Sequence, residues 1–468
     1  MKTSSACKKV STSFKQNDLK VVSGNSFSIG QYQLKTFLDK LQSPFGISQN
    51  YDLAPFVHWK GNSTSSIHRW LRYREAYSPE LIDKLDLNGK ILDPFSGCGS
   101  IMVGAAQRGL SSTGVDINPL STFSTKVKLA KLSTSEINQV KTIQKDLKAI
   151  INKSQASILP ELSISEKVFE PEILSVVLKS KSAIEKIRSE NPRVGDFLHL
   201  AWLESLEKIG SYFKEGNGIK YRNKQRSKIK YKDKKDGEWQ LKRFGNDQTS
   251  FAINCLSDQL NLMLEDTSEW KTGSWSKQEI KSGSALKLNE LIPRKKFDSI
   301  IFSPPYANRF DYFEAFKVEL WFGGFVSSYE GLNKLRKQSL RSHLAAEYRT
   351  TNPVFEELET LINMMDQTTS SWRMGVPDLL RGYFQDMHTV LKHCRNLAPN
   401  GRTHVVVGNS AFAGVIIPTD VLTAMIGIRS GFSKAKIIES RHLTVSPQQR
   451  AILSGFECYM RESVVIFE

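Results

Sequence analysis

Short apolar runs alternate with helical patterns in two parts of the chain. In the first part, KILDPF (90–95) is an apolar run that ends at a glycine-rich turn, and SIMVGAAQRG (100–109) has apolar residues at helical spacing. STGVDINP (112–119) follows as a second strand, closed by Asn-Pro. This strand–turn–helix–strand unit predicts parallel strands joined by a right-handed crossover.

The second part repeats the alternation near the C-terminal end of the sequence. FDSIIF (297–302) is a strongly apolar strand, and residues 379–401 form a long amphipathic helix that stops at Pro-Asn-Gly. Further strands are predicted at 402–410, 435–443 and 462–468. Together the two parts predict a doubly wound, mostly parallel α/β domain that is interrupted in the middle.

The interruption sets the predicted domain organisation. Residues 1–32 are predicted as a basic, serine-rich tail, and 33–132 as the first part of the α/β domain. Residues 133–276 are mostly polar with helical stretches and are predicted as an insertion. Residues 277–468 complete the α/β domain, with a helical, polar insert at about 326–374.

Composition and charge favour a polyanionic partner. The chain has 468 residues, of which 40% are hydrophobic, so it can bury a sizeable core. Its 65 Lys and Arg outnumber 48 Asp and Glu, for a formal net charge of +17. Such an excess of cations favours nucleic acid, because neutralised phosphates release counterions.

The cations gather most densely at 220–243, where Tyr221, Tyr231 and Trp239 stand among them. A run of this kind is either a solvated face or a nucleic-acid contact, and the interleaved aromatic residues favour the contact. The candidate DNA-binding residues are Lys220, Arg222, Lys224, Arg226, Lys228 and Lys230.

The cysteines predict neither a metal site nor a disulfide framework. All five stand singly, without a CxxC pair or a Cys/His cluster. The N-terminal segment lacks the apolar run of a signal peptide, and no stretch approaches the roughly 20 apolar residues of a membrane span. A cytoplasmic location is therefore expected.

The turn after the first strand suits a nucleoside-bearing cofactor. Gly97 and Gly99 allow the backbone to approach a ligand, and the helix N-terminus that follows favours an anionic carboxylate. Asp116 ends the next strand, where a carboxylate can accept hydrogen bonds from ribose hydroxyls. The alternative role of Asp116 is to cap the helix that begins at Asn118-Pro119.

The SPPY sequence after the strand at 297–302 carries the candidate chemistry. An exocyclic amine of a base is a poor nucleophile until its hydrogens are donated to fixed acceptors. Ser303 Oγ and the Pro304 carbonyl can be such acceptors, and Pro305 helps to keep the loop rigid. Tyr306 offers a ring face to a base rotated out of the duplex. The alternative is an ordinary Pro-Pro turn beside a surface tyrosine.

These motifs resemble those of the DNA amino-methyltransferases. DPFSGCGS (93–100) is similar to their cofactor motif and SPPY (303–306) to their catalytic motif, in the serine form typical of N4-cytosine enzymes. Weaker similarities, at 68–82, 282–288, 308–316 and 405–410, extend the resemblance to about half of the chain. The resemblance implies a seven-stranded Rossmann-like methyltransferase sheet, S-adenosylmethionine as cofactor, and double-stranded DNA as partner.

The resemblance also implies roles for individual residues. The predicted catalytic residues are Ser303, Pro304, Pro305 and Tyr306. Ser284 stands where the family often has an acidic residue, which weakens the expectation of an adenine contact there. The predicted cofactor-binding residues are Tyr73, Asp93, Pro94, Phe95, Gly97, Gly99, Asp116, Ile117 and Ser284.

The position of the insertion has a functional reading too. In the family, a module between the two motifs usually reads the target sequence, so 133–276 is expected to do so, with 326–374 as the rival. The expected activity is methylation of cytosine N4 in DNA, in a restriction-modification or defence setting with a cognate nuclease as partner. Adenine-N6 methylation of DNA, methylation of an RNA amino group, and non-catalytic DNA binding on a methylase scaffold are the alternatives.

Overall fold

The computed structural model describes residues 26–58, 64–73, 77–216, 218–222, 234–344, 355–445 and 449–468, the side chains of 26–29 and 234–238 excepted. Within these ranges, no helix is long and apolar enough to cross a lipid bilayer.

An eight-stranded sheet organises the α/β part of the molecule. Only β12 is antiparallel to its neighbours; the remaining pairs in the sheet are parallel. In spatial order the strands are β1 (Ser48–Gln49), β11 (Ala435–His442), β12 (Arg461–Phe467), β8 (Arg402–Gly408), β7 (Ser299–Phe302), β2 (Lys90–Asp93), β3 (Ser111–Asp116) and β6 (Gln278–Ser282).

This sheet confirms the predicted doubly wound, mostly parallel Rossmann-like fold, with one correction to the strand count. Seven strands were predicted, and the eighth is the two-residue edge strand β1, which pairs with Ile438 and Glu439 of β11. Asn50 continues the pairing by donating its N–H to the Glu439 carbonyl at 2.9 Å. Two residues carry no hydrophobic period, so the sequence pattern could not predict this strand.

Helices cover both faces of the sheet. Alternate strand residues point to opposite faces: Leu92 and Ile300 pack in one core with α17 and α18, whereas Ile91 and Ile301 pack in another with α2 and α3. The helices that flank the sheet are α1 (Ser26–Gln42), α2 (Leu81–Lys84), α3 (Ser100–Gln107), α4 (Pro119–Leu129), α11 (Leu288–Leu291), α17 (Val376–Leu397) and α18 (Thr419–Arg429). Helix α1 begins within the segment predicted as an N-terminal tail.

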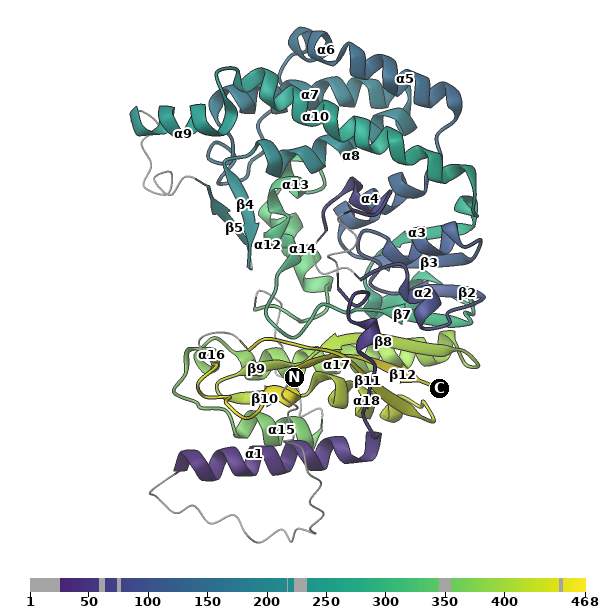
Figure 1. The fold of residues 1–468 in the computed structure, drawn as a ribbon, viewed down its shortest axis with the longest axis vertical. Coiled ribbons are helices and arrows are strands. Elements are labelled where there is room, and N and C mark those ends of the chain that lie inside the picture. The colour runs from purple at the N-terminus through teal and green to yellow at the C-terminus, as the bar shows by residue number, and fades with distance from the viewer. Residues whose placement is uncertain are drawn as a thin grey trace, which may run out of the picture.

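The segment 133–276 contains a separate layer of helices and a β-hairpin. Figure 1 shows this layer stacked beyond α4, at the end of the long axis opposite α1. Its elements are α5 (Thr134–Lys145), α6 (Leu147–Lys153), α7 (Pro171–Glu190), α8 (Pro192–Ile209), the hairpin β4 (Tyr212–Glu215) and β5 (Gly218–Tyr221), α9 (Lys234–Phe244) and α10 (Gln248–Asp266).

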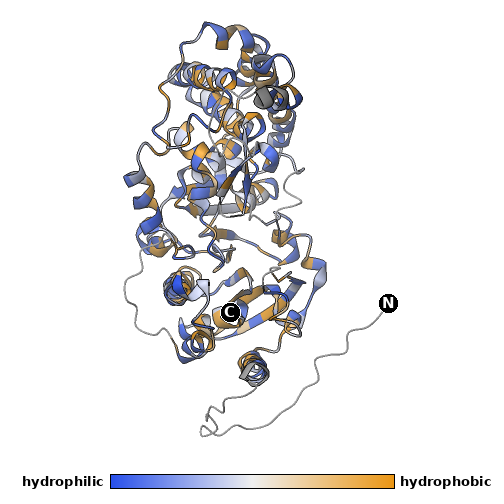
Figure 2. Ribbon diagram, turned by 90° about the vertical axis from the view of Figure 1, so that its left-hand side faces the viewer, coloured by the Kyte–Doolittle hydropathy of each residue, from blue (hydrophilic) through white to orange (hydrophobic). Residues whose placement is uncertain are grey.

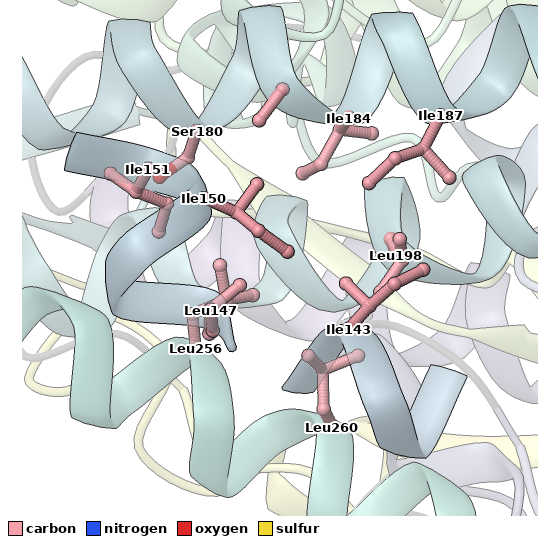
Figure 3. Close-up of a pocket in the computed structure, with 11 residues that line it drawn as sticks. Ile143, Leu147, Ile150, Ile151, Ser180, Ile184, Ile187, Leu198, Leu256 and Leu260 are labelled. Atoms are coloured by element: carbon pink, nitrogen blue, oxygen red, sulfur yellow. The ribbon is translucent and has the colours of Figure 1, made fainter. Parts of the chain in front are cut away.

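The helical layer is amphipathic, and its apolar core is continuous with α3 and α4 of the α/β part. In Figure 2 its helices mix blue and orange along their length, as helices with one buried face do. Figure 3 shows apolar side chains from α5, α6, α7, α8 and α10 converging on a cavity of about 10 Å³. A cavity of that size holds about one water molecule at most, so it is a packing defect and not a ligand site.

The segment between β7 and α17 packs against two parts of the molecule. Its residues Phe313, Phe316 and Trp321 share the core of the helical layer, whereas Leu358 and Leu361 share a core with the sheet. Its elements are α12 (Tyr312–Ala315), α13 (Lys317–Phe322), α14 (Tyr329–Gln338), α15 (Glu356–Asn363) and α16 (Ser370–Arg373). The hairpin β9 (Ser410–Phe412) and β10 (Val415–Ile417) follows β8.

Short 3-10 helices complete the described elements. They are η1 (Ser43–Phe45), η2 (Tyr51–Leu53), η4 (His68–Trp70), η6 (Thr267–Lys271), η7 (Trp275–Lys277), η8 (Ala285–Lys287) and η9 (Glu457–Tyr459).

Candidate active site

The turn between β2 and α3 requires two glycines. Gly97 and Gly99 have φ angles of +50° and +83°, which L-residues with a side chain rarely adopt. A Cβ on Gly99 would stand 2.7 Å from Cγ2 of Thr125 in α4, and a Cβ on Gly97 would stand 3.4 Å from Cε1 of Tyr73. Gly99 is therefore needed both for its φ angle and for the close approach to α4, whereas Gly97 is needed for its φ angle.

Asp93 ends β2 and stabilises the start of the turn. Its carboxylate accepts hydrogen bonds from the Tyr77 hydroxyl at 2.7 Å and from the Phe95 N–H at 3.0 Å. Burial raises the pKa of Asp93 to about 7, and the two hydrogen bonds act in the opposite direction. These contacts give Asp93 a structural task in shaping the glycine turn.

Asp116 ends β3 on the neighbouring strand. Its Oδ2 accepts from the Gly97 N–H and its Oδ1 from the Asn118 N–H, both at 2.8 Å. Burial raises the pKa of Asp116 to about 6. The N-cap of α4 is Asn118, and not Asp116; the Asn118 side chain accepts from the Leu120 N–H at 3.0 Å. The alternative role of Asp116 as that cap is therefore wrong.

One pocket joins the glycine turn to the SPPY loop. Its cavity volume is about 90 Å³, and it opens to solvent. The glycine turn, the end of β3 and the loop after β6 form one side, and Ser303 and Pro305 lie with them. Of the predicted residues, the pocket is lined by Tyr73, Pro94, Phe95, Gly97, Asp116, Ile117, Ser284, Ser303 and Pro305.

Four predicted site residues do not line this pocket: Asp93, Gly99, Pro304 and Tyr306. Tyr306 is partly buried, and its hydroxyl donates to Oε1 of Glu462 in β12 at 2.7 Å. A Cβ on Gly408 of β8 would stand 2.9 Å from Cε2 of Tyr306, so the ring crosses β8 at a position that only glycine allows.

Tyr73 lines the pocket next to Gly97. Its ring stacks on Phe316 at 4.9 Å between centroids and on Tyr312 at 6.0 Å. Its hydroxyl accepts a hydrogen bond from Ser121 Oγ at 3.2 Å. Burial raises the pKa of the Tyr73 phenol, so this side chain presents a neutral aromatic wall.

The sequence patterns did not predict several residues that line the pocket. The segment around α12 and the end of α14 contributes a polar and aromatic wall that belongs to no quoted cofactor or catalytic motif. Burial lowers the pKa of His343 in this wall, which favours its neutral form. The additional lining residues are Asn118, Ala285, Leu286, Tyr312, Phe313, Ser339, Leu340, Ser342 and His343. The similarity noted at 308–316 was the one signal that pointed to part of this wall.

Only two of the six candidate DNA-binding cations fall within the described residues. Lys220 pairs with Glu215 across the β4–β5 hairpin, with Nζ and Oε2 2.5 Å apart. Arg222 is partly buried: it donates to the Glu207 carbonyl at 3.3 Å and stands 5.6 Å above the Phe213 ring. Burial lowers the pKa of Arg222. Lys224, Arg226, Lys228 and Lys230 lie outside the described residues.

The residues of the pocket fit S-adenosylmethionine. The N-terminus of α3 follows Gly97 and Gly99, whose backbone is not covered by a side chain. Its free N–H groups suit a carboxylate. The partly buried Asp116 carboxylate can accept from ribose hydroxyls, and Ile117, Ala285 and Leu286 offer apolar surface to a base.

Comparison with known proteins identifies relatives over most of the chain. No protein-family model matches it. The chain is 25% identical over 449 residues to the type II methyltransferase M.BsoBI of Geobacillus stearothermophilus, a match that covers 88% of this chain and 87% of the relative. It is 24% identical over 429 residues to the type II methyltransferase M.AvaI of Anabaena variabilis, covering 86% and 85%.

A more distant sequence relative has a name of the same class. The type II methyltransferase M.MvaI of Kocuria varians is 21% identical over 413 residues, covering 82% of this chain and 85% of the relative. Among solved structures, an rRNA methyltransferase of Streptomyces viridochromogenes matches at 10% identity over 87% of this chain and 92% of its own, but its TM-score of 0.27 carries no argument. The chain is thus a homologue of the type II methyltransferases, and this relationship implies S-adenosylmethionine as the methyl donor.

Proposed function

We propose that this protein is a DNA methyltransferase that transfers a methyl group from S-adenosylmethionine to the exocyclic N4 amine of cytosine. One observation carries the proposal: Ser303 and Pro305 line the same pocket as Gly97 and Asp116. A methyl donor held at the glycine turn and an amine held at the SPPY loop would therefore share one cavity. Relatives named type II methyltransferases support this reading.

The proposed chemistry is positioning. S-adenosylmethionine supplies an electrophilic methyl group when bound. Ser303 Oγ and the Pro304 carbonyl accept hydrogen bonds from the target amine, which orients the nitrogen lone pair. Pro304 and Pro305 carry no amide N–H and restrict the backbone of this loop, so its acceptors are fixed before the substrate arrives. In this proposal Tyr306 stacks on the base that has left the duplex.

The choice of base is the finer part of the proposal. The serine at position 303 favours cytosine N4, because the adenine-N6 enzymes that the motif resembles more often have Asp or Asn there. Adenine N6 in DNA and an amino group in RNA are the alternatives with the same mechanism. A non-catalytic DNA-binding protein on a methylase scaffold is the alternative of another class.

The setting is proposed with the activity. The helical layer formed by 133–276 is proposed to read the target, with the basic segment after β5 on the DNA backbone. The wall at 339–343 belongs to the rival insert, and it lines the pocket directly. A restriction-modification system, a cognate nuclease partner and a cytoplasmic location remain predictions.

The test is to identify the methylated nucleoside. Purified protein is incubated with labelled S-adenosylmethionine and duplex DNA of mixed sequence, the DNA is digested, and the labelled nucleoside is identified by mass. Label in N4-methylcytosine is the expected result, and label in N6-methyladenine would correct the base while keeping the mechanism. Cofactor binding without label in DNA would favour an RNA substrate, and the absence of both label and cofactor binding would favour the scaffold alternative.

A further inference from the structure

We propose that Asp266, in the inserted helical layer, is a positioning residue for the cofactor pocket. Asp266 ends α10 and is buried, with 3% of its surface exposed. Its carboxylate accepts four hydrogen bonds, all from the short segment Ile67–Trp70, which lies about two hundred residues earlier in the chain. An inserted element thus holds a segment of the α/β part.

The four bonds are distributed over both carboxylate oxygens. Oδ2 accepts from the Ile67 N–H at 2.8 Å, from Arg69 Nε at 3.0 Å and from Trp70 Nε1 at 3.0 Å. Oδ1 accepts from Arg69 Nη2 at 2.7 Å. The contact with Arg69 is therefore a bidentate ion pair, the geometry in which a carboxylate and a guanidinium give the strongest orientation.

The segment needs such support because its backbone is strained. Ile67 has φ and ψ angles of +66° and −42°, a positive-φ conformation that a β-branched residue strongly disfavours. Asp266 accepts the hydrogen bond of that residue's own N–H. The ring of Trp70 also packs edge-on against Trp270, with 5.4 Å between centroids, so the helical layer fixes both ends of this turn.

The strained segment leads directly to the pocket wall. Tyr73 follows Trp70 by three residues and lines the pocket against Gly97. A second carboxylate of the helical layer, Glu204 in α8, accepts the Arg72 N–H at 2.7 Å. The backbone on the N-terminal side of Tyr73 is thus held at successive points by the helical layer.

A buried lysine joins this segment to the glycine turn. The Lys128 ammonium, fully buried in α4, donates to the Cys98 carbonyl at 3.1 Å and the His68 carbonyl at 3.4 Å. One side chain thus joins the segment that leads to Tyr73 with the glycine turn, and both Tyr73 and Gly97 line the pocket. Asp266 therefore sets the position of Tyr73, and through it the inserted helical layer contributes to cofactor affinity. This inference rests on the proposed methyltransferase function.

The test is D266N, with binding of S-adenosylmethionine measured by calorimetry in the absence of DNA. In this variant an NH2 group, which is a donor, replaces one of the two acceptor oxygens and faces another donor. The negative charge opposite Arg69 is also lost. We expect about tenfold weaker cofactor binding. We also expect a raised KM for the cofactor with little change in kcat at saturation, because Asp266 does not line the pocket. A generally damaged fold would lower kcat as well.

Matched variants make the outcome decisive. D258N removes the same charge from an exposed position on α10 and should bind the cofactor like the unaltered protein. R69Q removes two of the four hydrogen bonds and should weaken binding less than D266N does; it decides the question if D266N does not fold. Wild-type affinity in a folded D266N or, failing that, in R69Q would overturn the inference. Failure of the unaltered protein to bind S-adenosylmethionine would overturn the proposed function, and this inference with it.

Discussion

The hydroxyl of Tyr306 donates a 2.7 Å hydrogen bond to Oε1 of Glu462, and this bond ties the SPPY loop to β12. Glu462 is only 2% exposed, and its Oε2 accepts from Arg441 Nε at 2.5 Å. The carboxylate is therefore oriented by a cation on β11 and in turn orients the tyrosine. The ring proposed to stack on the target base has a fixed position before any base arrives.

Two substitutions of Tyr306 distinguish the contribution of its ring from that of its hydrogen bond to Glu462. Y306F keeps the ring but loses the hydrogen bond, so we expect the single-turnover methylation rate to fall about three- to tenfold. Y306A also loses the stacking surface and leaves Glu462 with one partner fewer, so its rate should fall further, by about 100-fold in all. Both should bind S-adenosylmethionine normally. Equal rates for the two variants would show that the ring itself contributes nothing.

Ser303 gives the direct test of the acceptor role. S303A removes one of two proposed acceptors for the target amine, and we expect kcat to fall about 100-fold. Cofactor affinity, measured by calorimetry, should change little, because the glycine turn and Asp116 stay intact. S303D or S303N restores an acceptor and would test whether the side-chain type influences the choice between cytosine and adenine. A turnover near wild type for S303A would remove Ser303 from the mechanism.

Asp93 predicts a dependence of stability on pH. Burial raises its pKa from 3.8 to about 7 in the folded protein. Between those values the folded chain binds more protons than the unfolded chain, so the contribution of Asp93 to the free energy of unfolding falls as pH rises from about 4 to about 7.

The measurement is urea unfolding of the wild type and D93N across this pH range. D93N cannot ionise, so the difference between the two free energies of unfolding should shift in favour of D93N with rising pH, by up to about 3 kcal/mol. A difference that is independent of pH would mean that Asp93 ionises normally in the folded protein.

The sequence predicted the elements whose signal is local. The apolar run that ends at Asp93, the glycines of the turn and the carboxylate that ends β3 are all encoded within about 25 residues, as expected for a βαβ unit. The strand before SPPY is equally local. Because parallel strands end at the same edge of the sheet, the two motifs could be expected to meet there, and the pocket contains residues of both.

Contacts between distant segments could not be predicted in this way. His343 and Ser342 reach the pocket because α14 folds back over the loop after SPPY, and no periodicity in the sequence indicates that return. Asp266 has the same character: it is one acidic residue at a helix end, and its four donors lie about two hundred residues away. Such roles depend on tertiary packing and need a structure to be found.

The basic segment after β5 remains a prediction, and it can be tested without knowledge of its conformation. Replacing Lys224, Arg226, Lys228 and Lys230 together by glutamine removes four positive charges from a segment predicted to contact the DNA backbone. We expect weaker duplex binding and a slope of log affinity against log salt that is less steep by roughly three to four, because fewer counterions are released. Cofactor affinity should not change.

R222Q is the matched control. Arg222 packs over Phe213 and donates to the Glu207 carbonyl, so its replacement should lower the free energy of unfolding and change the salt slope little. An unaltered salt slope in the fourfold variant would assign DNA binding to another surface, with the insert at 326–374 as the next to examine.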